Sequence, residues 1–399
     1  MKFISFGCWN KGDPKKSEYP IKHLLDELNK FISNRLVKSQ RVVRSSIWDG
    51  AIDFIVITGD NYYPNIKKIY SEEDTLTDII NKPEEDYQWQ PFKEVINYSI
   101  SSGGGKVAYC NLNHLDHVFS KLKNISDTYD IPIYMCSGNH EYKEHTIFIP
   151  EIVSPPIERP KNPLEYELPH KSNLLDIQKG LFNCNRCTFI ESGRLIEGLP
   201  FFVINTEEEH IDSNEHIIEL INKETGEIYI FGHIPILSLK VKKEKHMVVN
   251  KYLVDLFCKL KEGITVTYIC ADTHNYQDIT ITFENGTLVN QVILGTGGTF
   301  PLDDIVDDRD KLNSLSLPDK INHIHIKKAI TGNHGFGLFD TDIRDHKFIE
   351  FFDTALGGYK LKKSKNKKYK KIITKRRYNK RKTKRRTNKR KTKKRKNNK

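Results

Sequence analysis

Four stretches of the chain place acidic, amide or imidazole side chains directly after a short apolar run. Residues 59–63 read Gly-Asp-Asn-Tyr-Tyr and follow the apolar run 54–57. The arrangement recurs in three further stretches, 138–141 (Gly-Asn-His-Glu), 232–235 (Gly-His-Ile-Pro) and 272–275 (Asp-Thr-His-Asn). Strands that each deliver such a residue at one end are how an α/β protein assembles a metal site from distant sequence. The pattern therefore predicts a metal centre at the ends of several buried strands.

The elements that must position these residues alternate between helices and strands. Helical spacing of apolar residues predicts a helix over residues 21–37, and residues 114–123 also have a helical pattern. Apolar runs predict strands at residues 1–8, 53–58, 200–204, 228–231, 264–270, 278–283 and 288–294. This alternation favours an α/β fold. The shortness of the late strands indicates that part of the sheet is antiparallel.

The charge of the chain is distributed very unevenly. Of 64 Lys and Arg residues, 25 lie in residues 360–399, which hold no Asp or Glu, so residues 1–359 keep 39 bases against 52 acids. A segment so charged and so poor in apolar residues cannot bury enough surface to fold. We predict a catalytic domain over residues 1–355, with an insertion at 66–120, and a disordered Lys/Arg-rich tail at 356–399.

Composition also excludes several classes of protein. The sequence has no apolar stretch long enough to span a bilayer, and its first residues lack a signal-peptide core and cleavage site. Seven cysteines, an odd number, predict reduced thiols and an intracellular location. Cys184 and Cys187 form a single CxxC motif without the second pair that a structural zinc site needs.

Five stretches, in this order along the chain, resemble the motifs of the calcineurin-like metallophosphoesterases: residues 7–10, 59–63, 138–141, 232–235 and 271–275. Tyr63, three residues after Asp60, resembles the purple acid phosphatase branch. The likeness extends over roughly residues 1–340, because the glycines at 295–298 and 334–337 also look like late motifs of that branch.

The resemblance implies a four-layer α/β/β/α fold in which two mixed β-sheets pack as a sandwich flanked by helices. It implies two metal ions, drawn from iron, zinc and manganese. The ligands that it implies are Asp60 as the bridge, Tyr63 and His274 on the first metal, and Asn139 and His233 on the second. His140 would lie outside the ligand shell and donate a proton to the leaving group.

The sequence departs from the family pattern at two positions. Cys8 stands where the family has Asp, and Asp272 stands where it has His. Thiolate favours zinc or iron, whereas carboxylate favours manganese, magnesium or iron. We hypothesise that the changes compensate, so that Asp272 restores an anionic charge lost at position 8. Cys8 itself keeps two interpretations, as a metal ligand or as a small buried apolar residue.

Each candidate residue, taken singly, also has a purely structural interpretation. Asp, Asn and His often end strands or form turns, and a lone tyrosine or histidine is often a packing residue. The ordered set of motifs makes the metal interpretation the stronger one for Asp60, Asn139 and His233. The structural interpretation is stronger for Asp272 than for these three residues, because Asp is common at strand ends.

The sequence therefore predicts a metal-dependent phosphoester hydrolase of the acid phosphatase or phosphodiesterase type, with a hydroxide held by two metals as nucleophile. Asp60 and His140 are its predicted catalytic residues, and a phosphorylated molecule is its predicted substrate. The alternative is a degraded phosphoesterase fold that serves as a scaffold or binds nucleic acid. Residues 360–399 carry enough positive charge to contact nucleic acid or an anionic surface, and they suggest a nuclear or virion location.

Overall fold

The computed structural model describes residues 1–10, 20–39, 48–63, 65–69, 105–109, 112–142, 146–148, 174–207, 214–242, 245–298, 302–305, 317 and 319–351. All of these residues belong to the compact unit Met1–Phe352, and the remaining unit, Asp353–Lys399, lies outside the described residues. The predicted tail at 356–399 therefore stays a prediction, and most of the predicted insertion at 66–120 also lies outside the described residues.

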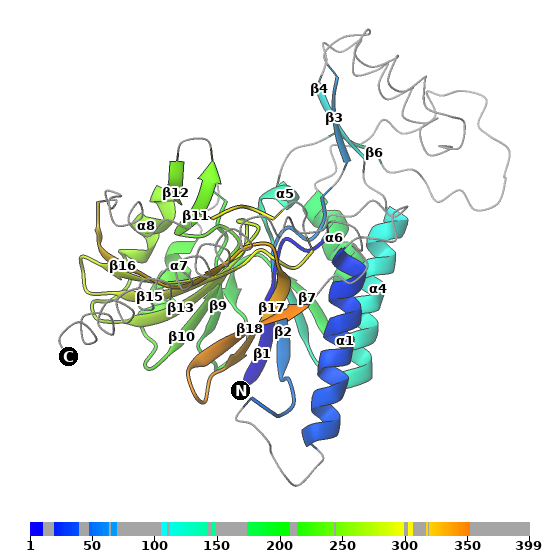
Figure 1. Cartoon of the computed structure of the whole chain (residues 1–399), viewed down its shortest axis with the longest axis horizontal. Helices are drawn as coiled ribbons and strands as arrows, with labels where there is room; N and C mark the ends of the chain where they lie inside the picture. Colours follow the sequence, from blue (N-terminus) through cyan, green and yellow to red (C-terminus); the bar gives the residue numbers. More distant parts are fainter. Residues whose placement is uncertain are drawn as a thin grey trace, which may run out of the picture. The chain divides into compact units, whose positions relative to one another are not determined.

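The N-terminal half of the chain builds most of a six-stranded mixed sheet (Figure 1). Its strands, in spatial order, are β18 (Asp345–Phe351), β17 (His334–Asp340), β1 (Lys2–Phe6), β2 (Phe54–Thr58), β5 (Ile133–Cys136) and β7 (Cys187–Ile190). The last four run parallel to one another, whereas β17 and β18 add antiparallel strands at one edge. The ends of β1, β2 and β5 therefore lie at the same edge of this sheet.

A seven-stranded mixed sheet follows. Its order is β16 (Ile321–Ile330), β14 (Tyr276–Phe283), β15 (Leu288–Leu294), β13 (Thr265–Cys270), β10 (Ile228–Phe231), β9 (Phe201–Val203) and β8 (Gly193–Arg194). Strands β9, β10, β13 and β15 are parallel, and β8, β14 and β16 are antiparallel to their neighbours. The predicted antiparallel portion among the late strands is confirmed.

The two sheets pack face to face. Alternate residues of a strand point to opposite faces of its sheet, so each sheet presents one apolar face to the other sheet. Phe3 of β1 stacks on Phe54 at 4.8 Å between ring centroids and meets Tyr229 of the other sheet edge-on at 5.6 Å. Its neighbour Ile4 points the other way, into a cluster that includes helix residues such as Leu28. The core thus has one apolar layer between the sheets and one outside each sheet.

Helices cover the two outer faces. On the six-stranded sheet these are α1 (Pro20–Ser39), α4 (Leu112–Tyr129) and α6 (Leu174–Phe182), with α1 and α4 side by side (Figure 1). On the seven-stranded sheet, α7 (Glu215–Ile221), α8 (Lys251–Phe257) and the hairpin of β11 (Leu237–Lys242) and β12 (Lys245–Val249) share one apolar cluster. The predicted four-layer α/β/β/α sandwich is confirmed.

A small three-stranded sheet is formed by strands that lie in sequence between strands of the six-stranded sheet. It consists of β3 (Asn65–Ile69), β4 (Gly105–Tyr109) and β6 (Thr146–Phe148). Strand β3 begins two residues after Tyr63, and β6 begins soon after the short helix α5 (Asn139–Tyr142).

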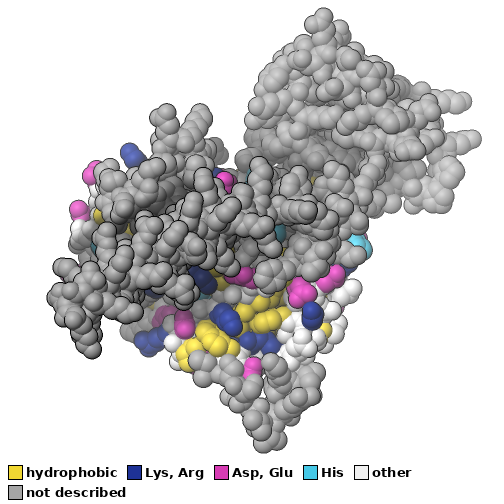
Figure 2. Space-filling model, in the orientation of Figure 1, with side chains coloured by type: hydrophobic (Ala, Val, Ile, Leu, Met, Phe, Trp, Pro, Cys, Tyr) yellow, Lys and Arg dark blue, Asp and Glu magenta, His cyan; other side chains and the backbone are white. Residues whose placement is uncertain are grey.

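On the face of the molecule drawn in Figure 2, the basic side chains of the described residues lie among acidic ones.

Candidate metal centre

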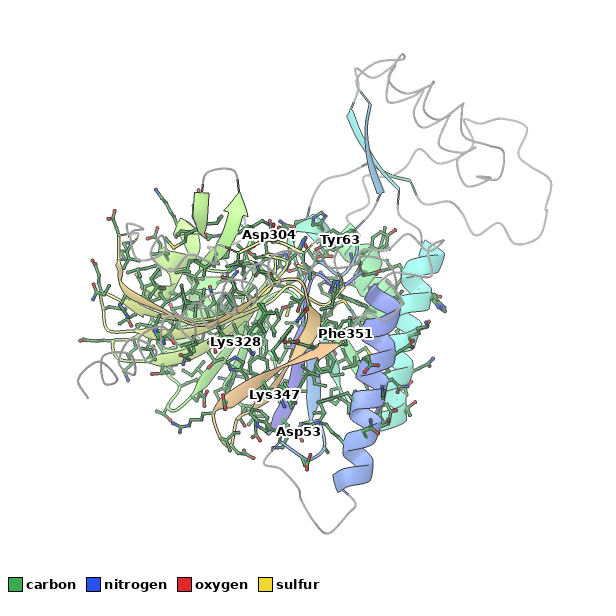
Figure 3. The ribbon with its side chains drawn as sticks, viewed as in Figure 1. Asp53, Tyr63, Asp304, Lys328, Lys347 and Phe351 are labelled. Carbon is green, nitrogen blue, oxygen red and sulfur yellow. The ribbon has the colours of Figure 1, made fainter. Side chains whose placement is uncertain are left out.

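The predicted site residues occupy equivalent places in the fold. Cys8, Asp60, His233 and Asp272 each follow the last residue of a parallel strand (β1, β2, β10 and β13, respectively) by two positions. Tyr63 lies at this end of the sheets, and Asp53, which precedes β2, lies at the other end (Figure 3). Backbone hydrogen bonds tie the loops together, since Cys8 N donates to Gly59 O at 3.1 Å. Four segments that are distant in sequence therefore meet at one edge.

Asp60 lies at the centre of this arrangement, and its two carboxylate oxygens have different neighbours. Oδ1 lies 3.2 Å from Nε2 of His233 and accepts a hydrogen bond from the backbone N–H of His140 at 3.2 Å. Oδ2 accepts a hydrogen bond from the Tyr63 hydroxyl at 2.7 Å and lies 3.9 Å from Sγ of Cys8. The carboxylate therefore presents one oxygen to each of two groups of donor atoms.

The oxygen, nitrogen and sulfur atoms of Asp60, His233 and Cys8 lie within 4.8 Å of one another, and all three residues are buried. Nδ1 of His233 donates to the carbonyl oxygen of Thr58 at 2.8 Å, because a carbonyl can only accept. This bond leaves Nε2 as the coordinating atom of the neutral ring. Nε2 is buried and faces Oδ1 of Asp60 at 3.2 Å and Oδ1 of Asp272 at 4.0 Å, so the donor set fits a cation.

Tyr63 and His274 form the other side of the site. The Tyr63 hydroxyl lies 3.3 Å from Nε2 of His274 as well as 2.7 Å from Oδ2 of Asp60. Asp272 also points toward the centre, with Oδ1 4.0 Å from Nε2 of His233, and its side chain is 34% exposed. The structure thus brings both departures from the family pattern, Cys8 and Asp272, to the same place as the other candidates.

Asn139 and His140 begin helix α5, and a backbone hydrogen bond joins this helix to Asp60. The N–H of His140 donates to Asp60, and the His140 ring lies 4.4 Å from the Tyr63 ring, between centroids. Asn139 precedes His140 at the first position of α5. Gly138 is needed here because a Cβ atom at this position would lie 2.3 Å from the backbone nitrogen of Asp60. The loop that precedes Asn139 is therefore in close backbone contact with the loop that carries Asp60.

Glu141 holds these two loops together. Its buried carboxylate accepts from the backbone N–H groups of Gly138 at 2.6 Å, Asn61 at 2.9 Å and Asp60 at 3.2 Å. The Gln178 side chain on α6 donates a fourth bond at 3.2 Å. Burial, and after it the charge of Asp60, raise the pKa of Glu141 to about 7, while the N–H donors favour the carboxylate form.

Three residues of the site have left-handed backbone conformations. Cys8, Asp60 and Asp272 have φ values of +50°, +52° and +47°, respectively. This region is uncommon for residues other than Gly, Asn and Asp, so Cys8 is the unusual one of the three, at a cost of about 1–2 kcal/mol. Such strain persists where surrounding contacts fix it, and it clusters at functional sites.

The charges of Asp60, His233 and Cys8 influence one another strongly. Burial acts to raise the pKa of Asp60, but the charge and hydrogen bond of His233 outweigh it and lower that pKa. Burial opposes the positive charge of His233, yet Asp60 raises the pKa of His233 to about 10. Burial, and then the charge of Asp60, raise the pKa of the Cys8 thiol. A cation would replace the proton on His233 and lower the pKa values of the acidic ligands.

Sequence reasoning missed three supporting residues. Glu141 belongs to a recognised motif, but nothing in its spacing shows that it binds three backbone N–H groups. Asp303 and Lys240 lie beside His274, with Asp303 Oδ2 accepting from the backbone N–H of His274 at 2.9 Å and from Lys240 Nζ at 2.7 Å. Neither residue belongs to a motif, and only the fold brings the segment 302–305 to the site.

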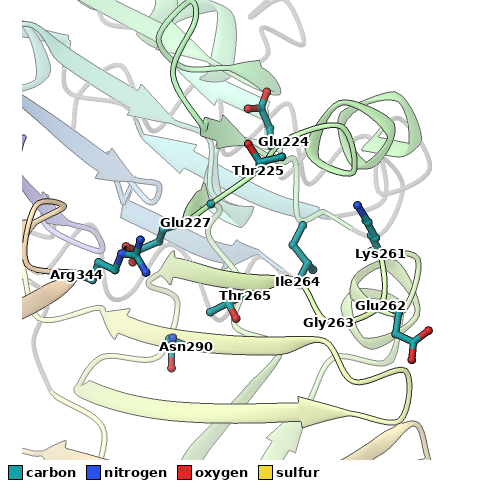
Figure 4. A pocket seen from close by; sticks show the side chains of 11 residues that line it. Glu224, Thr225, Glu227, Lys261, Glu262, Gly263, Ile264, Thr265, Asn290 and Arg344 are labelled. Carbon is teal, nitrogen blue, oxygen red and sulfur yellow. Dashed lines mark ion pairs between the residues drawn. The ribbon is translucent and has the colours of Figure 1, made fainter.

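A separate cavity of about 590 Å³ lies at the opposite end of the seven-stranded sheet (Figure 4). It is lined in part by Glu227, which precedes β10, and by Thr265, which begins β13. These are the ends of the strands far from His233 and Asp272. Two of its acidic residues form ion pairs, Glu227 with Arg344 at 3.5 Å and Glu224 with Arg194 at 2.6 Å. The cavity therefore takes no part in the candidate metal centre.

Comparisons with known proteins add little to this geometry. No family model matches the sequence, and no curated protein matches it. A solved structure of PhoD aligns with 10% sequence identity and a TM-score of 0.40, over 85% of this chain and 63% of that chain. The chain thus spans less than two thirds of the PhoD chain. The predicted purple acid phosphatase branch stays a prediction. Among the described residues, no helix combines the length and apolar content needed to cross a bilayer.

Proposed function

We propose that this chain is a metal-dependent phosphoester hydrolase whose active site is the cluster around Asp60. The observation that carries the proposal is the division of the Asp60 carboxylate between two donor groups. Oδ1 faces His233, whereas Oδ2 faces Tyr63 and Cys8. A carboxylate can bridge two cations because each oxygen is anionic, and close pairs of cations are typical of enzymes that hydrolyse phosphoesters.

The proposed ligands divide into two subsites that share Asp60. We assign Tyr63, His274 and Cys8 to the first subsite, and His233, Asn139 and Asp272 to the second. Zinc and iron suit the sulfur and phenol donors of the first subsite, and manganese suits the carboxylate of the second. Two bound cations would activate a water molecule as the nucleophile and neutralise charge that grows on the phosphoryl oxygens.

The side chains of this chain supply the remaining steps. Asp60 and the loops fixed by Glu141 hold the donor atoms in one place before substrate arrives. His140 lies next to Tyr63 at the rim of the site, and we assign it the transfer of a proton to the leaving oxygen. Monoesters and diesters both fit these roles, so the substrate class within the phosphoesters is a matter for experiment.

The two departures from the family pattern are part of the proposal. Sγ of Cys8 belongs to the buried donor group, and Oδ1 of Asp272 lies 4.0 Å from Nε2 of His233. We infer that Asp272 adds anionic charge to the second subsite and compensates for the loss of a carboxylate at position 8. Loss of metal in Cys8→Ala together with full metal binding in Asp272→Ala would contradict this compensation.

The test is hydrolysis of a chromogenic phosphate monoester and a diester by the purified full chain with added manganese, zinc or iron. We expect turnover with at least one metal, and we expect Asn139→Ala to abolish it while circular dichroism shows an unchanged fold. A folded protein without turnover on either ester, with any of these metals, would favour the non-enzymatic alternative. That alternative rests on the 25 basic residues of the segment 360–399.

A further inference from the structure

Asp303 forms a reciprocal pair of hydrogen bonds with the backbone of His274. The N–H of His274 donates to Oδ2 of Asp303 at 2.9 Å, and the N–H of Asp303 donates to the carbonyl oxygen of His274 at 2.8 Å. Both backbone groups of His274 are therefore fixed by one residue that lies 29 positions away in sequence. A hydrogen bond to a carboxylate is about twice as strong as one between neutral groups.

Lys240 completes this contact from a third segment. Its Nζ lies 2.7 Å from the same Oδ2 atom of Asp303, and the two side chains are 25% and 21% exposed. Strand β11, which carries Lys240, is itself fixed next to His274. The backbone N–H of Leu239 donates to the Gln277 side chain at 2.8 Å, and that side chain donates back to Leu239 O at 3.0 Å.

The position of the His274 ring depends on its backbone. Nε2 of His274 lies 3.3 Å from the Tyr63 hydroxyl, and a metal ligand must be held to within a few tenths of an ångström. His274 lies in the segment between β13 and β14, where no strand of the described part of the chain pairs with its backbone. The carboxylate of Asp303 takes the place of such a partner, and the ammonium of Lys240 balances its charge close to the carboxylates of the site.

We propose that Asp303 and Lys240 are positioning residues that hold His274 in place for the first metal subsite. The inference rests on the metal centre proposed above, but it concerns metal binding and not hydrolysis. A simpler role for the same contacts is to anchor the β11–β12 hairpin to the segment 302–305. The two roles predict different effects on bound metal, because an anchor alone would change stability without changing the affinity of one subsite.

The experiment measures metal bound per full-length chain, together with a titration of the metal-free protein with cobalt followed by visible absorption. We expect Asp303→Ala to weaken binding at one of two sites by about 10-fold to 100-fold, the usual cost of losing a group that orients a ligand. Asp303→Asn keeps an oxygen that accepts from His274, so we expect it to restore most of the affinity. Lys240→Gln should give a smaller loss than Asp303→Ala.

Lys259→Gln is the control, because Lys259 forms an ion pair of similar length, though more exposed, with Glu215 at 2.6 Å. We expect this variant to bind metal as the wild type does. The proposal is overturned if Asp303→Ala and Lys240→Gln bind two metals with wild-type affinity, or if Asp303→Asn binds as poorly as Asp303→Ala. It survives, and the proposed function fails, if the wild type binds two metals without hydrolysing any ester. A wild type that binds no metal overturns both.

Discussion

Asp60 and His233 follow strands of different sheets, yet Oδ1 of Asp60 lies 3.2 Å from Nε2 of His233. Asp60 follows β2 of the six-stranded sheet, and His233 follows β10 of the seven-stranded sheet. The contact is possible because the sheets pack face to face with these strand ends at a common edge. A cation bound here would link the two halves of the sandwich, so that metal binding and the stability of the whole fold become coupled.

Replacement of Asp60 by Asn should strongly reduce metal binding and activity while preserving the fold. Asn keeps the shape of the side chain and tolerates the left-handed backbone at φ +52°, but it removes the bridging charge. We expect kcat/KM to fall on the order of 10³-fold and bound metal to fall below one per chain. Asp304→Asn is the control, because Asp304 is an exposed carboxylate at the same end of the sheets (Figure 3).

Proton release during metal uptake should reveal whether Cys8 is a ligand. The thiol of Cys8 is protonated in the metal-free protein because burial raises its pKa, and it must lose that proton to bind a cation. Calorimetry in two buffers of different ionisation enthalpy would give the number of protons released at pH 7.5. We expect Cys8→Ser to release about one proton fewer than the wild type. Equal release in the two proteins would show that Cys8 is a packing residue.

The metal-free protein should lose stability as the pH rises from about 7 to about 9. The pKa of His233 is raised to about 10 in the folded protein from about 6.5 in an unfolded chain. Its contribution to stability is therefore complete below pH 6.5 and is lost as the pH rises through 10. The free energy of unfolding should fall by at most about 1.4 kcal/mol per pH unit in this window.

Chemical denaturation of chelator-treated protein at several pH values measures this slope. His233→Gln should flatten it, because glutamine does not titrate. Saturation with zinc should also flatten it, since a bound cation takes the place of the proton on Nε2. A wild-type slope that His233→Gln leaves unchanged would assign the titration to another group.

Substitution of Glu141 by Ala should destabilise the protein strongly, although Glu141 contacts no metal in our proposal. The change would leave buried N–H groups of Gly138, Asp60 and Asn61 without their acceptor. We expect a loss of about 3–5 kcal/mol in the free energy of unfolding, measured by denaturant titration. Glu219→Ala, at an exposed position of α7, should change it by less than about 0.5 kcal/mol. A small effect of Glu141→Ala would mean that water replaces the carboxylate.

Deletion of residues 360–399 should separate phosphoester hydrolysis from the binding of nucleic acid. The segment holds 25 Lys and Arg residues and no acids, so it can neutralise many phosphates in a manner that depends on salt. We expect the truncated chain to hydrolyse a small phosphoester like the full chain, and to lose retention of RNA or DNA at low salt. Loss of hydrolysis in the truncated chain would show that the tail belongs to the active site.

Much of the fold could be predicted from the sequence because its core strands are short, continuous apolar runs. The predicted strand at 264–270 corresponds to β13 (Thr265–Cys270), and the predicted helix at 21–37 corresponds to α1 (Pro20–Ser39). Strand β16 (Ile321–Ile330) was not predicted, because it carries His323, His325 and two lysines on an exposed edge of the sheet. Such a strand gains its structure from its neighbour β14 and has no strong apolar pattern of its own.

The same distinction applies to the site. The apolar run of a buried strand indicates which residues follow the strand end, and it predicts Asp60, His233 and Asp272 as candidate site residues. Asp303 was not, because its role depends on a loop-to-loop contact whose partners are 29 residues apart and share no periodic pattern. Residues that orient other residues leave little trace in a single sequence.

The left-handed backbone at Cys8, Asp60 and Asp272 limits which side chains each position accepts. Asn and Asp enter this region more readily than other residues that have a Cβ atom, so Asp60 and Asp272 suit their backbone. Cys8 does not, and glycine there would relieve the local strain at the cost of greater freedom in the unfolded chain. The sulfur atom is therefore held at a position where the backbone alone would favour a residue without a side chain.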